Sequence, residues 1–232
     1  MRDRVMVVGA GMMGSGIGAM AALAGHPVTL VDLSEEQAVK GIEKAMECIR
    51  LREEQELASH EEAEAAAKLI KAGTDMEGEA DQAFMVIEAI VEKLEVKQEL
   101  FQKLDQILPR EVPICSNTSG LRITEISERC TCYPERTMTT HFWLPAHLVP
   151  LVEVVMGDKT EEAMAIMVRD ELLKWKKSPV LVRRDLPGQL ANRVFQAIIR
   201  EAIDIVASGL ATAEDVDTAI AAGMAMRFTV RG

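Results

Sequence analysis

The chain has 232 residues, of which 48% are hydrophobic and 27% charged, enough for one large core or two modest ones. This composition excludes a disordered chain and a collagen-like repeat. The 26 Lys and Arg against 37 Asp and Glu give a formal net charge of -11, and the basic residues are scattered, so nucleic acid and membrane surfaces are excluded as expected partners.

The sequence predicts a soluble, cytoplasmic protein. Residues 1–4 run directly into a strand-like segment without the pattern of a signal peptide, and no later apolar stretch approaches membrane-spanning length. Four cysteines are too few for a disulfide scaffold in a chain of this size and favour a reducing compartment. Cys130 and Cys132 form a C-x-C pair that nothing nearby completes as a metal set, so no metal site is expected.

The first fifty residues predict a complete β-α-β unit. A short Val-rich run over 4–9 (RVMVVG) ends in glycines, and an apolar stretch at helical spacing follows over 15–24. A second run of β-branched residues over 27–32 (PVTLVD) predicts the next strand. A parallel sheet is therefore expected.

A helical hairpin is expected next. Residues 34–71 are rich in Ala, Glu, Lys and Leu and contain no proline. The stretch is broken near Ala58, where Ser59 and Glu62 form a capping box for a second helix.

Strand-like runs alternate with helical patterns in the middle of the chain, as in a doubly wound sheet. The runs cover 83–88, 112–116, 137–142, 151–155 and 179–182. After Pro187 the pattern becomes all-helical, with predicted helices over 188–207 and 213–222, the second capped by Thr212 and Asp215. Residues 224–232 stop without a closing helix, so this helical part looks unfinished.

Three glycines indicate a dinucleotide site. Gly9, Gly11 and Gly14 have the G-x-G-x-x-G spacing between the first strand and the first helix, where they permit a tight turn, close approach of the pyrophosphate and close helix packing. Asp32 ends the second strand, where its carboxylate can accept hydrogen bonds from a ribose. Because two glutamates and no arginine follow Asp32, NAD is favoured over NADP. The alternative is that the glycines serve only the turn and Asp32 only caps the strand.

A histidine and a glutamate form a candidate catalytic pair. His141 ends one strand-like run, and Glu153 lies within the next, between apolar residues. A carboxylate in an apolar strand needs a partner. If the strands are neighbours, Glu153 can fix the tautomer of His141 and stabilise the imidazolium that forms when it takes a proton from an alcohol. The alternative is a structural histidine.

The chain resembles the 3-hydroxyacyl-CoA dehydrogenase family over essentially its whole length. Five ordered segments carry the resemblance: GAGMMGSGIGAMAALAGHPVTLVD, VIEAIVEKLEVKQELFQKLD, SNTSGL, HFWLPAHLVPLVEVV and PGQLANRVFQAIIREAIDIVASGLATAEDVD. It implies an α/β fold, a Rossmann-like, doubly wound, mostly parallel sheet with a helical hairpin insertion, followed by the start of an all-α C-terminal domain. The expected NAD-binding domain is 1–184, and 185–232 is the N-terminal part of a helical substrate and dimerisation domain, apparently truncated.

The resemblance also implies an activity and site residues. It implies NAD-dependent oxidation of a short-chain L-3-hydroxyacyl-CoA, such as 3-hydroxybutyryl-CoA, in fatty acid metabolism, by a homodimer. His141 would be the general base and Glu153 its orienting partner, with Ser119 and Asn192 around the substrate oxygen. The residues expected at the cofactor are Gly9, Gly11, Met12, Met13, Gly14, Asp32, Ala89, Glu92, Lys97 and Asn117, with Glu92 and Lys97 beside the nicotinamide half.

Two departures leave the substrate open. Family members have Asn where this chain has Leu144, and an aromatic residue where it has Gln189. The hairpin, where relatives that use CoA meet its nucleotide, carries Arg50 and Arg52 among many acidic residues. One alternative is an NAD-dependent dehydrogenase of a small free hydroxy acid or alcohol, of the carnitine, gulonate or pyridoxine-degradation type. Another is a non-catalytic NAD-binding or crystallin-like structural protein.

Overall fold

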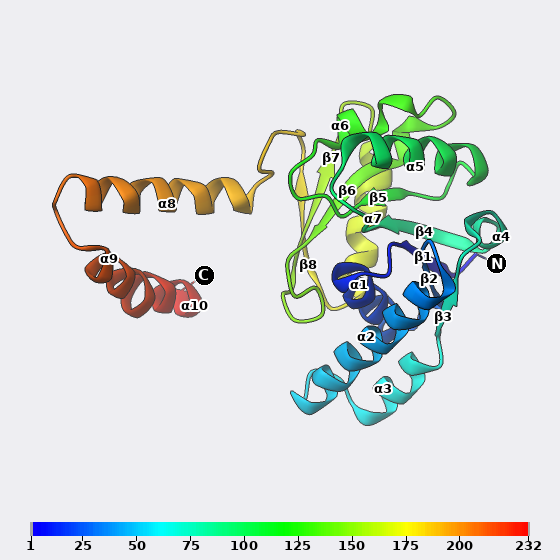
Figure 1. Ribbon diagram of the computed structural model, residues 1–232, viewed down its shortest axis with the longest axis horizontal. Coiled ribbons are helices and arrows are strands. Elements are labelled where there is room, and N and C mark those ends of the chain that lie inside the picture. Colours follow the sequence, from blue (N-terminus) through cyan, green and yellow to red (C-terminus); the bar gives the residue numbers. More distant parts are fainter. Residues whose placement is uncertain (1, 232) are drawn as a thin grey trace. The chain divides into compact units, whose positions relative to one another are not determined.

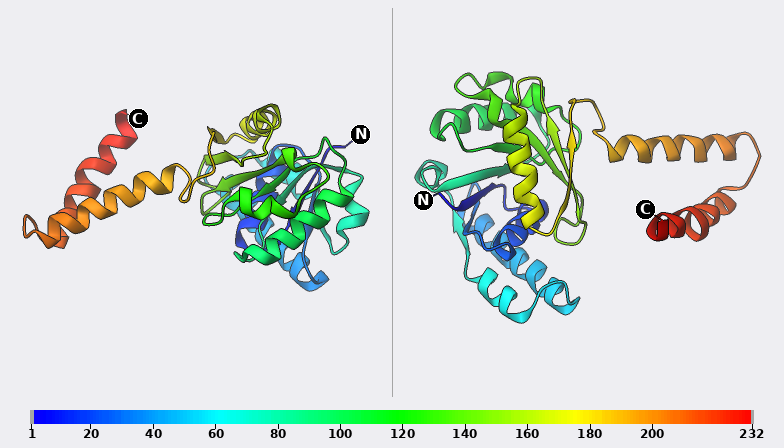
Figure 2. Two further views of the ribbon diagram at one scale, coloured as in Figure 1. Left: turned by 90° about the horizontal axis from the view of Figure 1, so that it is seen from above. Right: turned by 180° about the vertical axis from the view of Figure 1, so that it is seen from behind.

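The structure, a computed structural model, describes residues 2–231 and divides the chain into two compact units. The first unit ends at Gln189 and the second begins at Leu190. The first contains a sheet with its covering helices, and the second contains helices alone (Figures 1 and 2).

Within residues 2–231, eight strands form one sheet in the order β3-β2-β1-β4-β5-β6-β7-β8. β1 to β6 are parallel, β7 runs antiparallel to β6, and β8 is parallel to β7. The strand order reverses at β1, between β2 and β4, and ligands of open α/β sheets bind outside the carboxyl ends of the strands at such a point. The strands are β1 (Arg4–Val8), β2 (Val28–Val31), β3 (Ile70–Gly73), β4 (Ala83–Glu88), β5 (Ile114–Ser116), β6 (Thr137–Phe142), β7 (Leu151–Met156) and β8 (Ser178–Val182).

Helices cover both faces of the sheet. Residues of α1, α2, α3 and α7 share one core with one face, and residues of α4, α5 and α6 share another core with the opposite face. These helices and short 3-10 turns are α1 (Met12–Leu23), α2 (Glu35–Glu54), α3 (His60–Ala67), α4 (Met76–Ala80), α5 (Leu94–Ile107), α6 (Ile123–Ile126), η1 (Ser127–Arg129), η2 (Pro134–Arg136) and α7 (Glu162–Lys174). None of the helices within the described range is long and apolar enough to span a membrane.

The two cores follow from the two-residue period of a strand. In β1, Val5 and Val7 pack in the core beneath α1, whereas Met6 and Val8 pack in the opposite core. Full burial of each such side chain stabilises the fold by about 1.5–3 kcal/mol. A strand buried on both faces is usually a nearly continuous apolar run, which is why a run such as RVMVVG identifies a central strand in the sequence.

The predicted fold class is confirmed, and the predicted hairpin is wrong at its end. The hairpin is formed by α2 and α3, and the capping box of Ser59 and Glu62 is present. Residues 70–71, which the composition assigned to the second helix, belong instead to β3. β3 is a short edge strand that pairs with β2 alone, so its extended conformation depends on tertiary pairing rather than on its own sequence.

Two other boundaries differ in the helical part. Helix α8 (Ala191–Ala207) begins after Gly188 and Gln189, because both have positive φ values, +80° and +50°, that no α-helix accepts. The prediction that residues 224–232 contain no closing helix is also wrong for residues 224–231, and residue 232 lies outside the described residues. The chain continues from α9 (Ala213–Ala219) through a π-helical turn, η3 (Ile220–Ala225), into α10 (Met226–Arg231).

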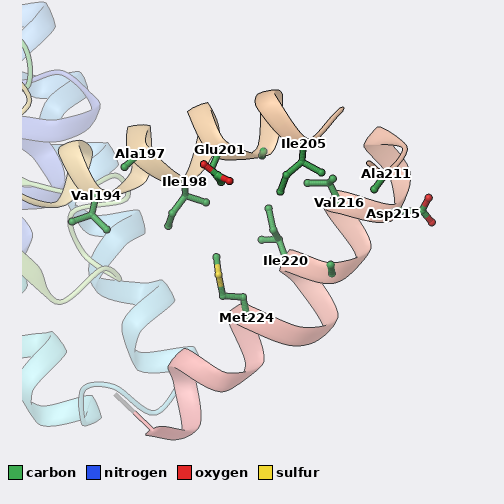
Figure 3. Close-up of a pocket in the computed structure, with 12 residues that line it drawn as sticks. Val194, Ala197, Ile198, Glu201, Ile205, Ala211, Asp215, Val216, Ile220 and Met224 are labelled. Carbon is green, nitrogen blue, oxygen red and sulfur yellow. The ribbon is translucent and has the colours of Figure 1, made fainter. Parts of the chain in front are cut away.

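The second unit leaves an apolar groove between α8 and the segment from α9 to η3 (Figure 3). The groove has a volume of about 580 Å³ and is lined by Val194, Ile198, Ile205, Val216, Ile220 and Met224, among others. No residue of α8 is buried. The amphipathic face of α8 is therefore still exposed.

Two buried cations hold the connection between β6 and β7. Lys177, which precedes β8, donates hydrogen bonds to the carbonyl oxygens of Ala146 and, at 2.9 Å, Val149. Arg52 of α2 donates to the carbonyl oxygen of His147 at 2.5 Å. Burial, together with repulsion from the Arg52 guanidinium, lowers the pKa of Lys177 to about 8.

This pKa predicts a pH dependence of stability. The unfolded chain holds the Lys177 proton up to the ordinary lysine value of 10.5, whereas the folded protein releases it near pH 8. The unfolded state binds more protons between these values, so the free energy of unfolding should rise with pH there, by at most about 1.4 kcal/mol per pH unit. Urea denaturation across this range should show the rise in the wild type and not in Lys177→Met.

Lys176→Met is the matched control, since Lys176 is exposed and pairs with Glu62 at the surface. If Lys177→Met and the wild type follow parallel curves, the lowered pKa of Lys177 is refuted.

Candidate active site

The glycine-rich turn joins β1 to α1 at the point where the strand order reverses. Gly9 has a φ of +102°, and a Cβ placed there would lie 2.6 Å from the carbonyl oxygen of Ala89, which follows β4. A Cβ on Gly14 would lie 1.8 Å from the carbonyl oxygen of Gly9. A Cβ on Gly11, in contrast, would meet nothing within 4 Å. The fold thus requires glycine at positions 9 and 14. At position 11 the protein has room for a side chain, so a requirement for glycine there would come from a bound ligand.

The N-terminus of α1 is open to an anion. Gly11 is its N-cap and makes no side-chain cap, and the first turn, with Met12 and Met13, holds no acidic residue. Within the described residues, this leaves the first backbone N–H groups and the positive end of the helix dipole beside the open space at Gly11. A pyrophosphate fits this site.

Asp32 accepts hydrogen bonds from the backbone on both sides and can still accept one from a ribose. Its Oδ2 accepts a hydrogen bond from the Ala10 N–H and its Oδ1 from the Leu33 N–H, both at 2.7 Å, so it orders the glycine-rich turn. Each oxygen keeps a further lone pair for a ribose hydroxyl. Asp32 also lines a pocket of about 280 Å³ with Gly9 and with apolar residues that include Met76, Ile90 and Leu100. This pocket has the place and lining that an adenosine needs.

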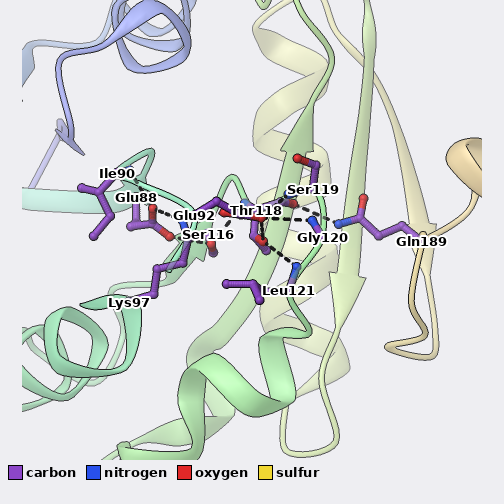
Figure 4. Close-up of polar contacts among 10 residues, drawn as sticks. All are labelled: Glu88, Ile90, Glu92, Lys97, Ser116, Thr118, Ser119, Gly120, Leu121 and Gln189. Atoms are coloured by element: carbon purple, nitrogen blue, oxygen red, sulfur yellow. Dashed lines mark hydrogen bonds and ion pairs between the residues drawn. The ribbon is translucent and has the colours of Figure 1, made fainter. Parts of the chain in front are cut away.

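A buried network lies beside this turn at the ends of β4 and β5 (Figure 4). Glu88 is fully buried and accepts hydrogen bonds from Lys97 Nζ and Ser116 Oγ, each at 2.5 Å, and from the Ile90 N–H at 2.7 Å. Lys97, 1% exposed, also pairs with Glu92 at 3.2 Å. The Lys97 ammonium therefore bridges two carboxylates, one buried and one partly exposed.

Glu92 fixes the loop that follows β5. One of its carboxylate oxygens accepts hydrogen bonds from Thr118 Oγ1 and from the N–H groups of Ser119 and Gly120 (Figure 4). Burial acts to raise the pKa of Glu92, but the hydrogen bonds from Thr118 and Gly120 and the charge of Lys97 outweigh it, so the pKa lies below the usual range. Glu92 is an anion at neutral pH, and Ser119 is held with its side chain exposed.

Gln189 connects this loop to the end of the first unit. Its amide nitrogen donates to the carbonyl oxygen of Thr118 at 3.0 Å, and its oxygen turns away from Thr118 (Figure 4). Gln189 has a φ of +50°, a left-handed conformation that costs a non-glycine residue about 1–3 kcal/mol. A buried hydrogen bond maintains this conformation, so Gln189 acts here as a structural link to the Ser119 loop.

His141 and Glu153 meet as the sequence predicted. They are directly opposed in the antiparallel ladder of β6 and β7, and His141 Nδ1 lies 2.8 Å from Glu153 Oε2. Glu153 is fully buried and His141 is 6% exposed. Trp143 Nε1 donates to the same Glu153 oxygen at 3.2 Å. With Nδ1–H donated to the carboxylate, Nε2 is left as the proton acceptor.

The remaining expected residues are placed as follows. Asn117 accepts a hydrogen bond from the Phe142 N–H through Oδ1 at 2.9 Å, which ties the end of β5 to the strand of His141. Leu144 is exposed. Asn192 lies in the first turn of α8 and belongs to the second unit. The structure thus places the residues expected at the cofactor and the His141–Glu153 pair in the first unit, and Asn192 in the second.

Glu88, Ser116 and Thr118 were missed by the sequence analysis. A signal for Glu88 was present, because it ends the apolar strand AFMVIE and a carboxylate there needs a partner for the same reason as Glu153. Ser116 and Thr118 carry no such signal, since hydroxyl residues are common in turns. Among residues 2–231, no cluster of three or more His, Cys, Asp or Glu is arranged to hold a metal ion.

Two family models match the chain. The model of the 3-hydroxyacyl-CoA dehydrogenase NAD binding domain matches residues 4–186, and the model of the 3-hydroxyacyl-CoA dehydrogenase C-terminal domain matches residues 188–230.

Individual proteins are similar over nearly the whole chain. It is 38% identical over 221 residues to the probable 3-hydroxybutyryl-CoA dehydrogenase of Bacillus subtilis, covering 95% of this chain and 76% of that protein. It is 31% identical over 229 residues to the 5-formyl-3-hydroxy-2-methylpyridine 4-carboxylate 5-dehydrogenase of Mesorhizobium japonicum, covering 98% and 72%. The solved structure of (S)-3-hydroxybutyryl-CoA dehydrogenase from Ralstonia eutropha aligns with a TM-score of 0.87 at 28% identity, over 96% of this chain and 78% of that one.

The different surroundings of Gly11 and Gly14 yield a paired prediction. Gly11→Ala should fold with an unchanged melting temperature, because its methyl group meets no protein atom, and should bind NAD about tenfold or more weakly, because the methyl occupies pyrophosphate space. Gly14→Ala should instead lower stability by about 1–3 kcal/mol or more, through its clash with Gly9. Thermal denaturation and NAD titration measure both. Undiminished NAD binding by Gly11→Ala would contradict the pyrophosphate site.

Proposed function

Because this chain belongs to the 3-hydroxyacyl-CoA dehydrogenase family, we propose that it oxidises a short-chain L-3-hydroxyacyl-CoA, such as 3-hydroxybutyryl-CoA, to the 3-oxoacyl-CoA. The chain is an NAD-dependent oxidoreductase that acts on a CH–OH group. The observation that carries the proposal is the buried His141–Glu153 pair, whose geometry suits removal of a proton from an alcohol.

In the proposed reaction the His141–Glu153 pair handles the proton and the cofactor handles the hydride. His141 Nε2 takes the hydroxyl proton, and Glu153 stabilises the imidazolium that forms and fixes the ring orientation. NAD, held by the residues of the glycine-rich turn, would supply the hydride acceptor at nicotinamide C4, so that loss of the hydroxyl proton and of hydride from the carbon that carries the hydroxyl group would leave a ketone and NADH. Ser119 and Asn192 are proposed to hold the substrate oxygen, with Asn192 contributed by the helical domain over 185–232.

The cofactor contacts are proposed from the first unit. Gly11, Met12 and Met13 would bind the pyrophosphate through the start of α1, and Asp32 would bind the adenosine ribose. Glu92 and Lys97, with Ala89 and Asn117, would border the nicotinamide half. The ordered contacts of Glu92 with the Ser119 loop support this arrangement, because they fix cofactor and substrate residues to one another.

A second candidate is oxidation of a small free hydroxy acid or alcohol. Arg52, one of two hairpin arginines considered for a CoA phosphate, is 8% exposed and donates to backbone carbonyls. It is therefore not available to a polyphosphate, which leaves Arg50 among acidic neighbours. The similarity to the pyridine carboxylate dehydrogenase of Mesorhizobium japonicum also supports this candidate.

We expect His141→Gln to lower kcat by about 100-fold or more, since glutamine cannot take the proton. NAD affinity should stay nearly constant, because His141 pairs with Glu153 and not with the glycine-rich turn. NADH formation and NAD titration test the two statements. His60→Gln is the control, as His60 is exposed on the hairpin; turnover by His141→Gln at the wild-type rate would refute the mechanism.

The substrate class is tested by NADH formation with 3-hydroxybutyryl-CoA, free 3-hydroxybutyrate, carnitine and gulonate at matched concentrations. The proposal predicts a higher kcat/KM for the thioester than for any free acid. Preference for a free acid would establish the second candidate. Failure to oxidise all four with NAD still bound would favour a non-catalytic NAD-binding protein.

A further inference from the structure

The connection between β6 and β7 touches the catalytic pair. It covers residues 143–150 and is bounded by Phe142 and Leu151. Its first residue, Trp143, donates a hydrogen bond to the Glu153 oxygen that also faces His141. A shift of this connection that reaches Trp143 therefore moves a hydrogen-bond donor of Glu153.

Two cations from distant parts of the fold anchor the connection from within. Lys177 binds the carbonyl oxygens of Ala146 and Val149, and Arg52 binds that of His147. Both cations are more than nine-tenths buried. Three backbone carbonyl groups between Ala146 and Val149 thus accept charge-assisted hydrogen bonds, which are stronger than neutral ones.

These two charges are buried without an ion-pair partner. No carboxylate of residues 2–231 lies within 4.0 Å of either side chain, and Arg52 Nε has no hydrogen-bond partner. Charges buried in this way are costly. A purely structural contact would be served by apolar packing, so the two cations indicate that the position of the connection itself matters.

We propose that Lys177, supported by Arg52, is a positioning residue for the dehydrogenation. It fixes the position of the 143–150 connection so that Trp143 and His141 both form their hydrogen bonds with Glu153. Lys177 acts through the His141–Glu153 pair and touches neither substrate nor cofactor. This inference rests on the proposed function of that pair.

A double-mutant cycle separates positioning from general stability. Lys177→Met should lower kcat about tenfold, while the Kd for NAD changes less than about twofold, and Lys177→Arg should restore kcat to within about threefold. In a Glu153→Gln background, Lys177→Met should change kcat less than about twofold, because the group it positions has already lost its charge. Lys176→Met, one residue away and exposed, should be neutral. An equal loss of kcat in both backgrounds, or no loss in either, overturns the proposal.

A second variant keeps the test valid if Lys177→Met does not fold. Trp143→Phe removes the donor to Glu153 and preserves an aromatic ring, so it should lower kcat several-fold in the wild type and not in Glu153→Gln. An unchanged kcat for Trp143→Phe contradicts the route through Glu153.

A readout without substrate distinguishes failure of this inference from failure of the proposed function. The downfield proton resonance of a His141 Nδ1–H donated to Glu153 should be present in the wild type, absent in Glu153→Gln, shifted in Lys177→Met and unshifted in Lys176→Met. If no substrate is oxidised but the Lys177→Met shift is seen, the proposed activity fails, whereas the effect of Lys177 on the geometry of the His141–Glu153 pair stands. If turnover occurs and the resonance does not move in Lys177→Met, the positioning role fails.

Discussion

The antiparallel pairing of β7 with β6 places a histidine opposite a glutamate inside an otherwise apolar sheet. His141 and Glu153 are twelve residues apart in sequence, and a shift of one residue in the register would turn one of them to the opposite face. Because Glu153 is fully buried, its carboxylate needs polar partners, and His141 and Trp143 are two of them. The catalytic geometry and the stability of the sheet therefore depend on the same contact.

Buried charges organise the rest of the site in the same manner. Burial of the Glu88 carboxylate at the end of β4 would be costly without its hydrogen bonds from Lys97 and Ser116. Lys97 also forms an ion pair with Glu92. Glu92 then orders the loop after β5. These groups satisfy one another's hydrogen-bonding capacity and charge. The turn that follows β4 and the loop that follows β5 are therefore fixed to each other before any ligand binds.

Much of the fold could be predicted from local signals. The glycines of the first turn have clear signatures in spacing and flanking strands, and the structure gives Gly9 and Gly14 surroundings that exclude a side chain. The strand β3 could not be predicted, because its sequence IKAG continues a helical composition and becomes a strand only by pairing with β2. The start of α8 was misplaced because the left-handed Gln189 carries no residue signal.

The sequence by itself determined the family, the NAD cofactor and the residue types of the candidate pair, because these depend on residue types at recognisable spacings along the chain. Only the tertiary structure decided that Glu88 and Thr118 join the site and that Arg52 faces inward to the 143–150 connection. Such contacts link residues from separate elements, and their partners are chosen by packing and by the need to satisfy buried charge. The pattern of residues along the chain does not show which partners these side chains will contact.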